Sequence, residues 1–187
     1  AGTGKTNMVA ALSKTLPNFK WKSVLLAPTG RAAKVLSNYS KKPAQTIHKK
    51  IFIKIPTHDG GVAFSLAENK HTNTIFVVDE ASMIGLDNPT SDSVYHSLLE
   101  SLLEYVFSGA NCKIILVGDT AQLPPIGSNE SPALNIDYLK ASYSLQIKHI
   151  ELKQVARQED ASGILKNATH LRECINNFKD EFPKISL

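Results

Sequence analysis

Three short apolar runs, each followed directly by polar or glycine-containing residues, constrain the fold of this chain most strongly. They are Ser23–Ala27, Thr74–Val78 and Lys113–Val117. Between the second and the third run, Leu98, Leu102 and Val106 share one helical face. Continuously apolar strands that alternate with helices predict an α/β fold, with a parallel sheet covered by helices on both faces. Because ligands bind at the carboxyl ends of the strands in such sheets, the residues after each run are candidate site residues.

The chain opens on the second half of a phosphate-binding loop, Ala1-Gly2-Thr3-Gly4-Lys5-Thr6. The full pattern is G-x-x-x-x-G-K-[ST], and its first glycine would precede Ala1, so we expect a fragment of a longer chain. Backbone N–H groups of Gly2, Thr3 and Gly4 would turn toward phosphate oxygens at the start of a helix. Lys5 would reach the β- and γ-phosphates of ATP, and the Thr6 hydroxyl would ligate Mg²⁺. The alternative is an ordinary surface loop.

Two carboxylates follow the second apolar run. Asp79 could hold Mg²⁺ beside the phosphates, and Glu80 is placed to polarise an attacking water as a general base. The alternative is a helix N-terminus that uses both acids to complement its dipole. A phosphate-binding loop in the same chain favours the catalytic interpretation.

The third run leads into Gly118-Asp119-Thr120-Ala121-Gln122-Leu123-Pro124-Pro125. A glutamine at a strand end can hydrogen-bond both the γ-phosphate and the attacking water, so Gln122 is expected to sense hydrolysis. The alternative is a turn, begun by Gly118 and Asp119 and stiffened by the prolines. The two interpretations are compatible, because a rigid turn would preorganise Gln122.

Charge is distributed unevenly along the chain. Residues 1–58 hold eleven Lys and Arg and no Asp or Glu, whereas the remaining residues hold ten basic and seventeen acidic side chains. This asymmetry indicates a nucleic acid or a phosphorylated ligand as partner of the N-terminal region, the alternative being a solvated lysine-rich surface. Two cysteines exclude a disulfide framework, and no apolar run reaches the roughly 18 residues of a membrane helix. No signal peptide opens the chain, so we expect a cytoplasmic protein without a membrane partner.

Six motifs follow one another over residues 1–158: Ala1–Thr6, Ala27–Ala33, Thr46–His48, Asp79–Ser82, Gly118–Pro125 and Val155–Gln158. Together they resemble the first motor domain of a superfamily 1 helicase, within the RecD-like and Dda-like branch. The resemblance implies a RecA-like P-loop NTPase fold, with ATP and Mg²⁺ as cofactors. It also implies 5′-to-3′ movement on single-stranded DNA in repair or recombination. The partners expected from it are single-stranded DNA and other subunits of a repair nuclease complex.

Roles at matching positions follow from the resemblance. Lys5 and Thr6 would bind ATP and Mg²⁺, with Asp79 as the second Mg²⁺ ligand. Glu80 would be the catalytic base, Gln122 would couple the γ-phosphate to movement, and Arg157 would contact the γ-phosphate. For Arg157 the alternative is a surface ion pair with the acids that follow it. The residues expected to face the DNA strand are Pro28, Thr29, Arg31, Thr46 and His48. For His48 a structural role is the alternative.

A small β-hairpin insertion is expected over residues 51–72. Apolar residues alternate with Lys54 and Ser65 on either side of a Gly-Gly turn. In helicases similar to this chain, an insertion here forms a pin that splits the duplex. Phe52 and Phe64 are candidates for stacking on bases, with packing inside the hairpin as the favoured alternative.

The expected organisation is an N-terminal RecA-like ATPase domain over residues 1–187, truncated at both ends and lacking the second motor domain of the family. Residues 161–178 form a predicted amphipathic helix. Because translocation needs two domains that close on ATP, this chain alone is expected to be weakly active or inactive. The alternatives are a P-loop NTPase without helicase activity (AAA-like or stress-induced), a small-molecule kinase, and an interaction module with a decayed ATP site. The first alternative does not explain the Thr46–His48 motif, and the second gives no role to Glu80 and Gln122. The third does not explain why Lys5 is intact.

Overall fold

The computed structural model describes residues 4–56, 60–86, 97–122, 125, 131–152, 170 and 174. The chain divides into two units, one of residues 5–150 and one of residues 1–4 and 151–187. Nearly all described residues belong to the first unit, and the architecture below is that of this unit alone. Arg157 and most of the predicted helix at 161–178 lie outside the described residues, although His170 and Cys174 are both helical.

A four-stranded parallel sheet forms the centre of this unit, with strand order β2-β1-β5-β6. The strands are β1 (Lys22–Ala27), β2 (Ala44–Thr46), β5 (Thr74–Val78) and β6 (Lys113–Leu116). Leu26 pairs with Val78, and Val78 pairs with Leu116, so the carboxyl ends of three strands lie level with one another. The three apolar runs of the sequence are therefore strands, as predicted, and β2 is an additional short edge strand.

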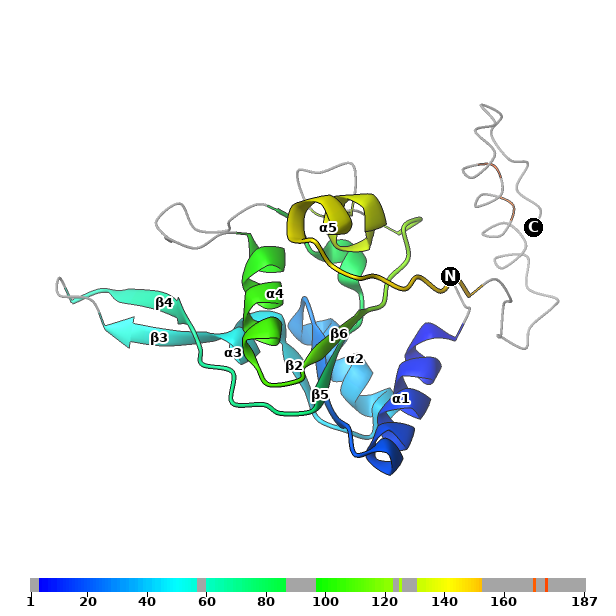
Figure 1. Cartoon of the computed structure of the whole chain (residues 1–187), viewed down its shortest axis with the longest axis horizontal. Coiled ribbons are helices and arrows are strands. Elements are labelled where there is room, and N and C mark those ends of the chain that lie inside the picture. Colours follow the sequence, from blue (N-terminus) through cyan, green and yellow to red (C-terminus); the bar gives the residue numbers. More distant parts are fainter. Residues whose placement is uncertain are drawn as a thin grey trace. The chain divides into compact units, whose positions relative to one another are not determined.

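Adjacent residues of each strand point to opposite faces of the sheet. On one face, Leu25 and Val77 share a buried cluster with Val9 and Leu36. The helices of this layer are α1 (Lys5–Thr15) and α2 (Gly30–Ser40), and the 3-10 segment Leu16–Phe19 follows α1. Both helices lie on the same side of the sheet (Figure 1).

The other face of the sheet carries the larger part of the core. Leu26, Phe76 and Val78 lie in one buried cluster with Ile47 and Leu102. The helices of this layer are α3 (Ile47–Ile51), α4 (Leu98–Ser108) and α5 (Ile136–Tyr143), with 3-10 segments at Ala81–Met83 and Pro132–Leu134. The sheet is thus covered on both faces, as the sequence predicts. Within the described part of the chain, no helix combines the length and the apolar character needed to cross a bilayer.

The segment Thr46–His48, predicted as a turn, is instead the junction between β2 and α3. The Thr46 hydroxyl accepts the Lys49 N–H at 3.3 Å and caps the helix. Ile47 and Ile51, four residues apart, are fully buried on the inner side of this helix. Burial of these two side chains on the sheet explains why one helical turn forms here rather than an open turn.

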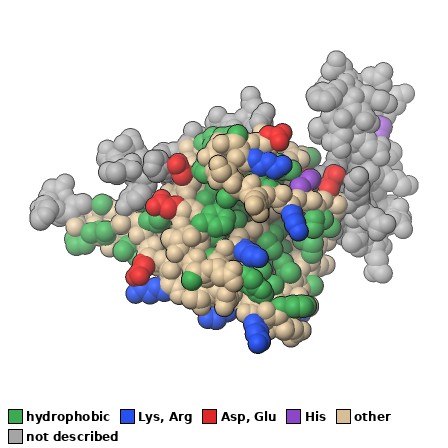
Figure 2. All heavy atoms as spheres, in the orientation of Figure 1, with side chains coloured by type: hydrophobic (Ala, Val, Ile, Leu, Met, Phe, Trp, Pro, Cys, Tyr) green, Lys and Arg blue, Asp and Glu red, His purple; other side chains and the backbone are tan. Residues whose placement is uncertain are grey.

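The predicted hairpin is present and projects from the body of the unit (Figure 1). Strands β3 (Phe52–Pro56) and β4 (Val62–Leu66) pair antiparallel, with Lys54 opposite Phe64. Gly60 has φ +82°, a conformation that favours glycine in the connection. Figure 2 shows hydrophobic side chains along the projecting ribbon, where Ile53, Ile55, Val62 and Phe64 are exposed. Phe52, by contrast, packs against the core at the base of the hairpin.

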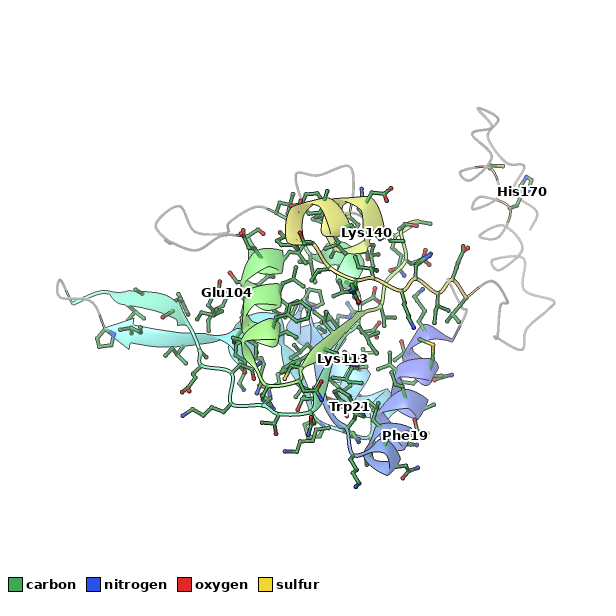
Figure 3. The ribbon with its side chains drawn as sticks, in the orientation of Figure 1. Phe19, Trp21, Glu104, Lys113, Lys140 and His170 are labelled. Atoms are coloured by element: carbon green, nitrogen blue, oxygen red, sulfur yellow. The ribbon has the colours of Figure 1, made fainter. Side chains whose placement is uncertain are left out.

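At the amino ends of the strands, an aromatic ring bridges two strands. Lys113 Nζ, at the start of β6, lies 4.9 Å from the ring centroid of Trp21, which precedes β1 (Figure 3). This cation–π contact joins strands that are not direct neighbours in the sheet. It lies at the edge opposite to the strand ends that carry the candidate site.

Candidate active site

Two side-chain contacts connect the start of α1 to the ends of β5 and β6. Thr6 Oγ1 donates to Asp79 Oδ2 at 3.3 Å. Lys5 Nζ donates to Asp119 Oδ2 at 3.2 Å, within a salt bridge. Residues far apart in the sequence are thus brought together at the carboxyl edge of the sheet, where α/β proteins bind ligands.

Backbone hydrogen bonds fix the two strand ends relative to each other. The Asp79 N–H donates to the Leu26 carbonyl at 3.0 Å, which continues the β1–β5 ladder past the last strand residue. The Val117 N–H donates to the Val78 carbonyl at 2.8 Å, and the Ala81 N–H donates to the Val117 carbonyl at 2.9 Å. The position of the acidic motif is therefore set by the sheet itself.

Glu80 adopts a left-handed backbone conformation, with φ +55° and ψ +37°. Its N–H donates to Asp79 Oδ1 at 3.0 Å, and its carbonyl accepts the Met83 N–H at 3.1 Å. A left-handed conformation costs a non-glycine residue free energy, and such strain concentrates at functional sites. The bonds on both sides of Glu80 hold this conformation in place.

Burial shifts the pKa of both acids in this motif upward. For Asp79, burial raises the pKa, and the hydrogen bonds from the Glu80 N–H and Thr6 and the charge of Lys5 oppose it. For Glu80, burial and then the charge of Asp79 raise the pKa, against the charge of Lys5. A carboxylate with a raised pKa is a better proton acceptor near neutral pH, which suits Glu80 to the role of general base.

Asp119 is a site residue that sequence reasoning missed. Its side chain is buried, Oδ1 accepts the Ala121 N–H at 3.2 Å, and its carbonyl accepts the Gln122 N–H at 3.0 Å. The pKa of Asp119 lies below its usual range: burial raises it, whereas hydrogen bonds to the carboxylate, those from Lys5 and Ala121 among them, lower it. Its position directly after an apolar run was the signal that could have identified it. Asp119 is thus both the partner of Lys5 and the base of the turn that carries the exposed Gln122.

Gly118 lies where the 3-10 segments Ala81–Met83 and Pro132–Leu134 approach the strand end closely. A Cβ at this position would lie 2.7 Å from Leu134 Cδ1 and 3.0 Å from the Ser82 backbone nitrogen. We expect Gly118→Ala to lower the free energy of unfolding by about 1–3 kcal/mol, as overpacked substitutions do. Denaturant unfolding followed by circular dichroism measures the change.

The matched control is Gly30→Ala. A Cβ at Gly30, the first residue of α2, meets nothing within 4 Å. The free energy of unfolding of this variant should stay equal to that of the parent chain or rise, because alanine favours the helix. Equal behaviour of the two variants would contradict the crowding inferred at Gly118.

Magnesium would find suitable ligands at the Thr6–Asp79 contact. A hydroxyl and a carboxylate oxygen are hard ligands that suit Mg²⁺. No group of three or more His, Cys, Asp or Glu among the described residues could hold a metal ion by itself.

The predicted DNA-facing residues lie at the ends of the neighbouring strands β1 and β2, which pair Ala27 with Thr46. Thr29 caps α2 by accepting the Ala32 N–H at 3.2 Å, as Thr46 caps α3. Pro28 is half-buried and Arg31 is exposed.

His48 follows Thr46 and lies beside the base of the hairpin. Its ring centroid is 5.9 Å from that of Phe52, and burial lowers its pKa. His48 thus has one ring contact and is otherwise exposed, so its role stays a prediction. Gly2, Thr3 and Arg157 lie outside the described residues, so their roles stay predictions.

The model of one protein family, described as an AAA domain, matches residues 1–177. This chain belongs to that family. An ATP-dependent RecD2 DNA helicase of Deinococcus radiodurans is 29% identical over 171 residues, which cover 89% of this chain and 20% of the relative. The ATP-dependent DNA helicase dda of Enterobacteria phage T4 is 30% identical over 136 residues, which cover 71% of this chain and 28% of the relative. This AAA domain thus spans less than a third of the length of these relatives, and its resemblance to RecD-like and Dda-like helicases is confirmed.

A solved structure confirms the fold of this AAA domain. It is Pif1 of Bacteroides sp. in complex with ADP-AlF4, which is 18% identical. The TM-score is 0.55, and the match covers 97% of this chain and 41% of that structure. The α/β fold of the RecA-like P-loop class, predicted from the sequence, is therefore confirmed.

Proposed function

We propose that this chain is the ATP-binding and ATP-hydrolysing N-terminal motor domain of a DNA helicase of the RecD-like branch. Its work would be 5′-to-3′ translocation on single-stranded DNA in repair or recombination. The observation that carries the proposal is the convergence of Lys5, Thr6, Asp79 and Glu80 at one edge of the sheet. The RecD2 and Dda relatives, both ATP-dependent DNA helicases by name, support the same assignment.

The roles of the nucleotide-site residues follow from their chemistry. Lys5 would bind the β- and γ-phosphates, with backbone N–H groups of Gly2, Thr3 and Gly4 around them. Thr6 and Asp79 would hold Mg²⁺, which when bound neutralises charge on the phosphates. Glu80 would accept a proton from the attacking water.

Two further side chains would complete the reaction. Gln122 stands on an exposed turn beside the site, and we assign it the contact to the γ-phosphate that couples hydrolysis to movement. Arg157 would contact the γ-phosphate from the segment after Leu152. The second motor domain found in helicases of this branch would close on the other side of the nucleotide.

For DNA, the two capping threonines provide suitable groups. The hydroxyl oxygens of Thr29 and Thr46 accept backbone N–H groups, so each hydroxyl keeps its own hydrogen for donation to a DNA phosphate. Arg31, exposed on the first turn of α2, would add a positive charge near the same phosphates. Pro28 and His48 would line the same edge. Other subunits of a repair nuclease complex are proposed partners, and we place the protein in the cytoplasm.

The ATPase activity of the complete gene product, with and without single-stranded DNA, tests this proposal. We expect DNA to stimulate hydrolysis several-fold, and single-stranded RNA serves as the comparison ligand. Hydrolysis that no nucleic acid stimulates would instead support a P-loop NTPase without helicase activity. Absence of nucleotide binding would exclude both functions.

We further propose that the β3–β4 hairpin separates the strands of duplex DNA. Its apolar side chains are exposed, and Phe64 is 49% exposed whereas Phe52 packs at the base. Shortening the segment from Lys54 to Phe64 is expected to abolish unwinding and to leave DNA-stimulated ATPase activity intact. A strand-displacement assay on a fluorescent duplex, run beside an ATPase assay, measures both.

Single substitutions refine this test. Phe64→Ala should reduce unwinding alone, because an exposed ring on the projecting hairpin can stack on a base. Phe52→Ala should lower the thermal stability, because its ring packs against the core. Equal loss of unwinding and of ATPase activity in the shortened variant would contradict the proposal that the hairpin acts in strand separation and not in ATP hydrolysis.

A further inference from the structure

Lys5, the lysine of the phosphate-binding loop, has an ionic partner in the structure. Its Nζ lies 3.2 Å from Asp119 Oδ2, and the side chains of Lys5 and Asp119 are 19% and 1% exposed. Asp119 is not needed for the Mg²⁺ or the general-base role, which Asp79 and Glu80 fill. The Lys5–Asp119 pair therefore requires its own explanation.

The carboxylates around Lys5 would compete with the nucleotide phosphates for the Lys5 ammonium. The charge of Lys5 also lowers the pKa of Asp79 and of Glu80, so the Lys5 ammonium acts on three carboxylates. The phosphates of ATP or ADP would bring further oxygen anions to the same ammonium. A phosphate oxygen and Asp119 Oδ2 are chemically equivalent acceptors for the Lys5 N–H groups.

We propose that Asp119 holds the Lys5 ammonium in the nucleotide-free site as a substitute for a phosphate, and releases it when nucleotide binds. Asp119 is thus a positioning residue that keeps Lys5 directed into the site. The same carboxylate opposes tight nucleotide binding, because the Lys5–Asp119 pair must separate first. This inference rests on the proposed nucleotide-binding function and names a further residue that regulates it.

The placement of Asp119 extends the effect to Gln122. One carboxylate oxygen holds Lys5, while the other holds the Ala121 N–H and the Asp119 carbonyl holds the Gln122 N–H. Loss of the ammonium from Asp119 changes the charge at the base of the turn that carries Gln122. The state of Lys5 is therefore communicated to the proposed γ-phosphate sensor through one residue.

Asp119→Asn tests whether Asp119 and the nucleotide phosphates exchange as partners of Lys5. The asparagine keeps the size of the side chain and an oxygen for the Ala121 N–H, but it loses the charge that competes for Lys5. We expect ADP to bind about tenfold more tightly to this variant, as loss of one charge-assisted competitor implies. Isothermal titration of the complete gene product with ADP measures the dissociation constant. A purely structural role of Asp119 would give equal or weaker binding, which would overturn the proposal.

A double-mutant cycle with Lys5→Met separates competition from simple repulsion. If Asp119 acts by holding Lys5, Asp119→Asn should tighten ADP binding far less in the Lys5→Met background. An equal gain in both backgrounds would mean that Asp119 only repels phosphates, and would overturn the proposed exchange. Asp119→Ser, which also removes the charge and keeps an acceptor, serves if the asparagine variant does not fold. Failure of the parent protein to bind ADP would instead refute the proposed function.

Discussion

The Glu80→Gln variant is expected to bind ATP with nearly unchanged affinity and to hydrolyse it about 10²- to 10⁴-fold more slowly, the usual contribution of general acid–base catalysis. Glutamine keeps the length of the side chain but cannot accept the proton of the attacking water. The main-chain bonds that hold residue 80 in its left-handed conformation use the Glu80 backbone N–H and carbonyl, so they survive the substitution. Single-turnover hydrolysis and ATP titration on the complete gene product measure the two quantities separately.

Glu104→Gln is the matched control for this variant. Glu104, labelled in Figure 3, is exposed on α4, and Glu104→Gln makes the same change of charge at a residue that is not one of the candidate site residues. Its hydrolysis rate should equal that of the parent protein. Hydrolysis by Glu80→Gln at the parent rate would assign the proton transfer to another group.

The Lys5→Met variant is expected to lose affinity for ATP on the order of 100-fold, because charge-assisted hydrogen bonds to phosphate are removed. It should also lower the free energy of unfolding by about 1–3 kcal/mol, because the charge-assisted hydrogen bond from Lys5 to the buried Asp119 is lost. The side chain of Asp119 is only 1% exposed, and its Oδ1 accepts the Ala121 N–H independently of Lys5. ATP titration and denaturant unfolding measure the two effects.

The double variant Lys5→Met/Asp119→Asn divides these two effects. Removal of the Asp119 charge should restore part of the stability, while ATP binding should stay weak because no ammonium is present at position 5. Lys14→Met, near the exposed end of α1, should change neither quantity. Restored ATP binding in the double variant would show that Lys5 does not contact the phosphates.

The central fold was predictable because three of its strands are almost continuously apolar in sequence. Thr74–Val78 and Lys113–Val117 carry no charge between their ends, and such apolar runs occur where helices cover both faces of a sheet. The carboxylate motif at Asp79 was likewise predictable, since it follows such a run directly. In these cases the position of a motif directly after a strand was enough to place it, because parallel strands have their carboxyl ends at the same edge of the sheet.

The parts that were missed depend on contacts across the sequence. α3 is one short helical turn whose formation requires burial of Ile47 and Ile51 against the sheet, and its sequence alone favours a turn as much as a helix. The partner of Lys5 could not be selected from sequence, because Asp79, Glu80 and Asp119 all follow strand ends. Only the geometry distinguishes the one that reaches the ammonium.

The two helices α1 and α2 have a mechanical consequence for the proposed motor. α1 begins at Lys5, the proposed phosphate ligand, and α2 begins at the candidate DNA edge. Val9 of α1 and Leu36 of α2 lie in one buried hydrophobic cluster on the same face of the sheet. Close-packed side chains transmit small displacements rather than absorbing them. If α1 tilts when its first turn binds phosphate, the packed side chains would therefore displace α2 as well. Nucleotide binding would then move the candidate DNA edge directly, without a separate linker.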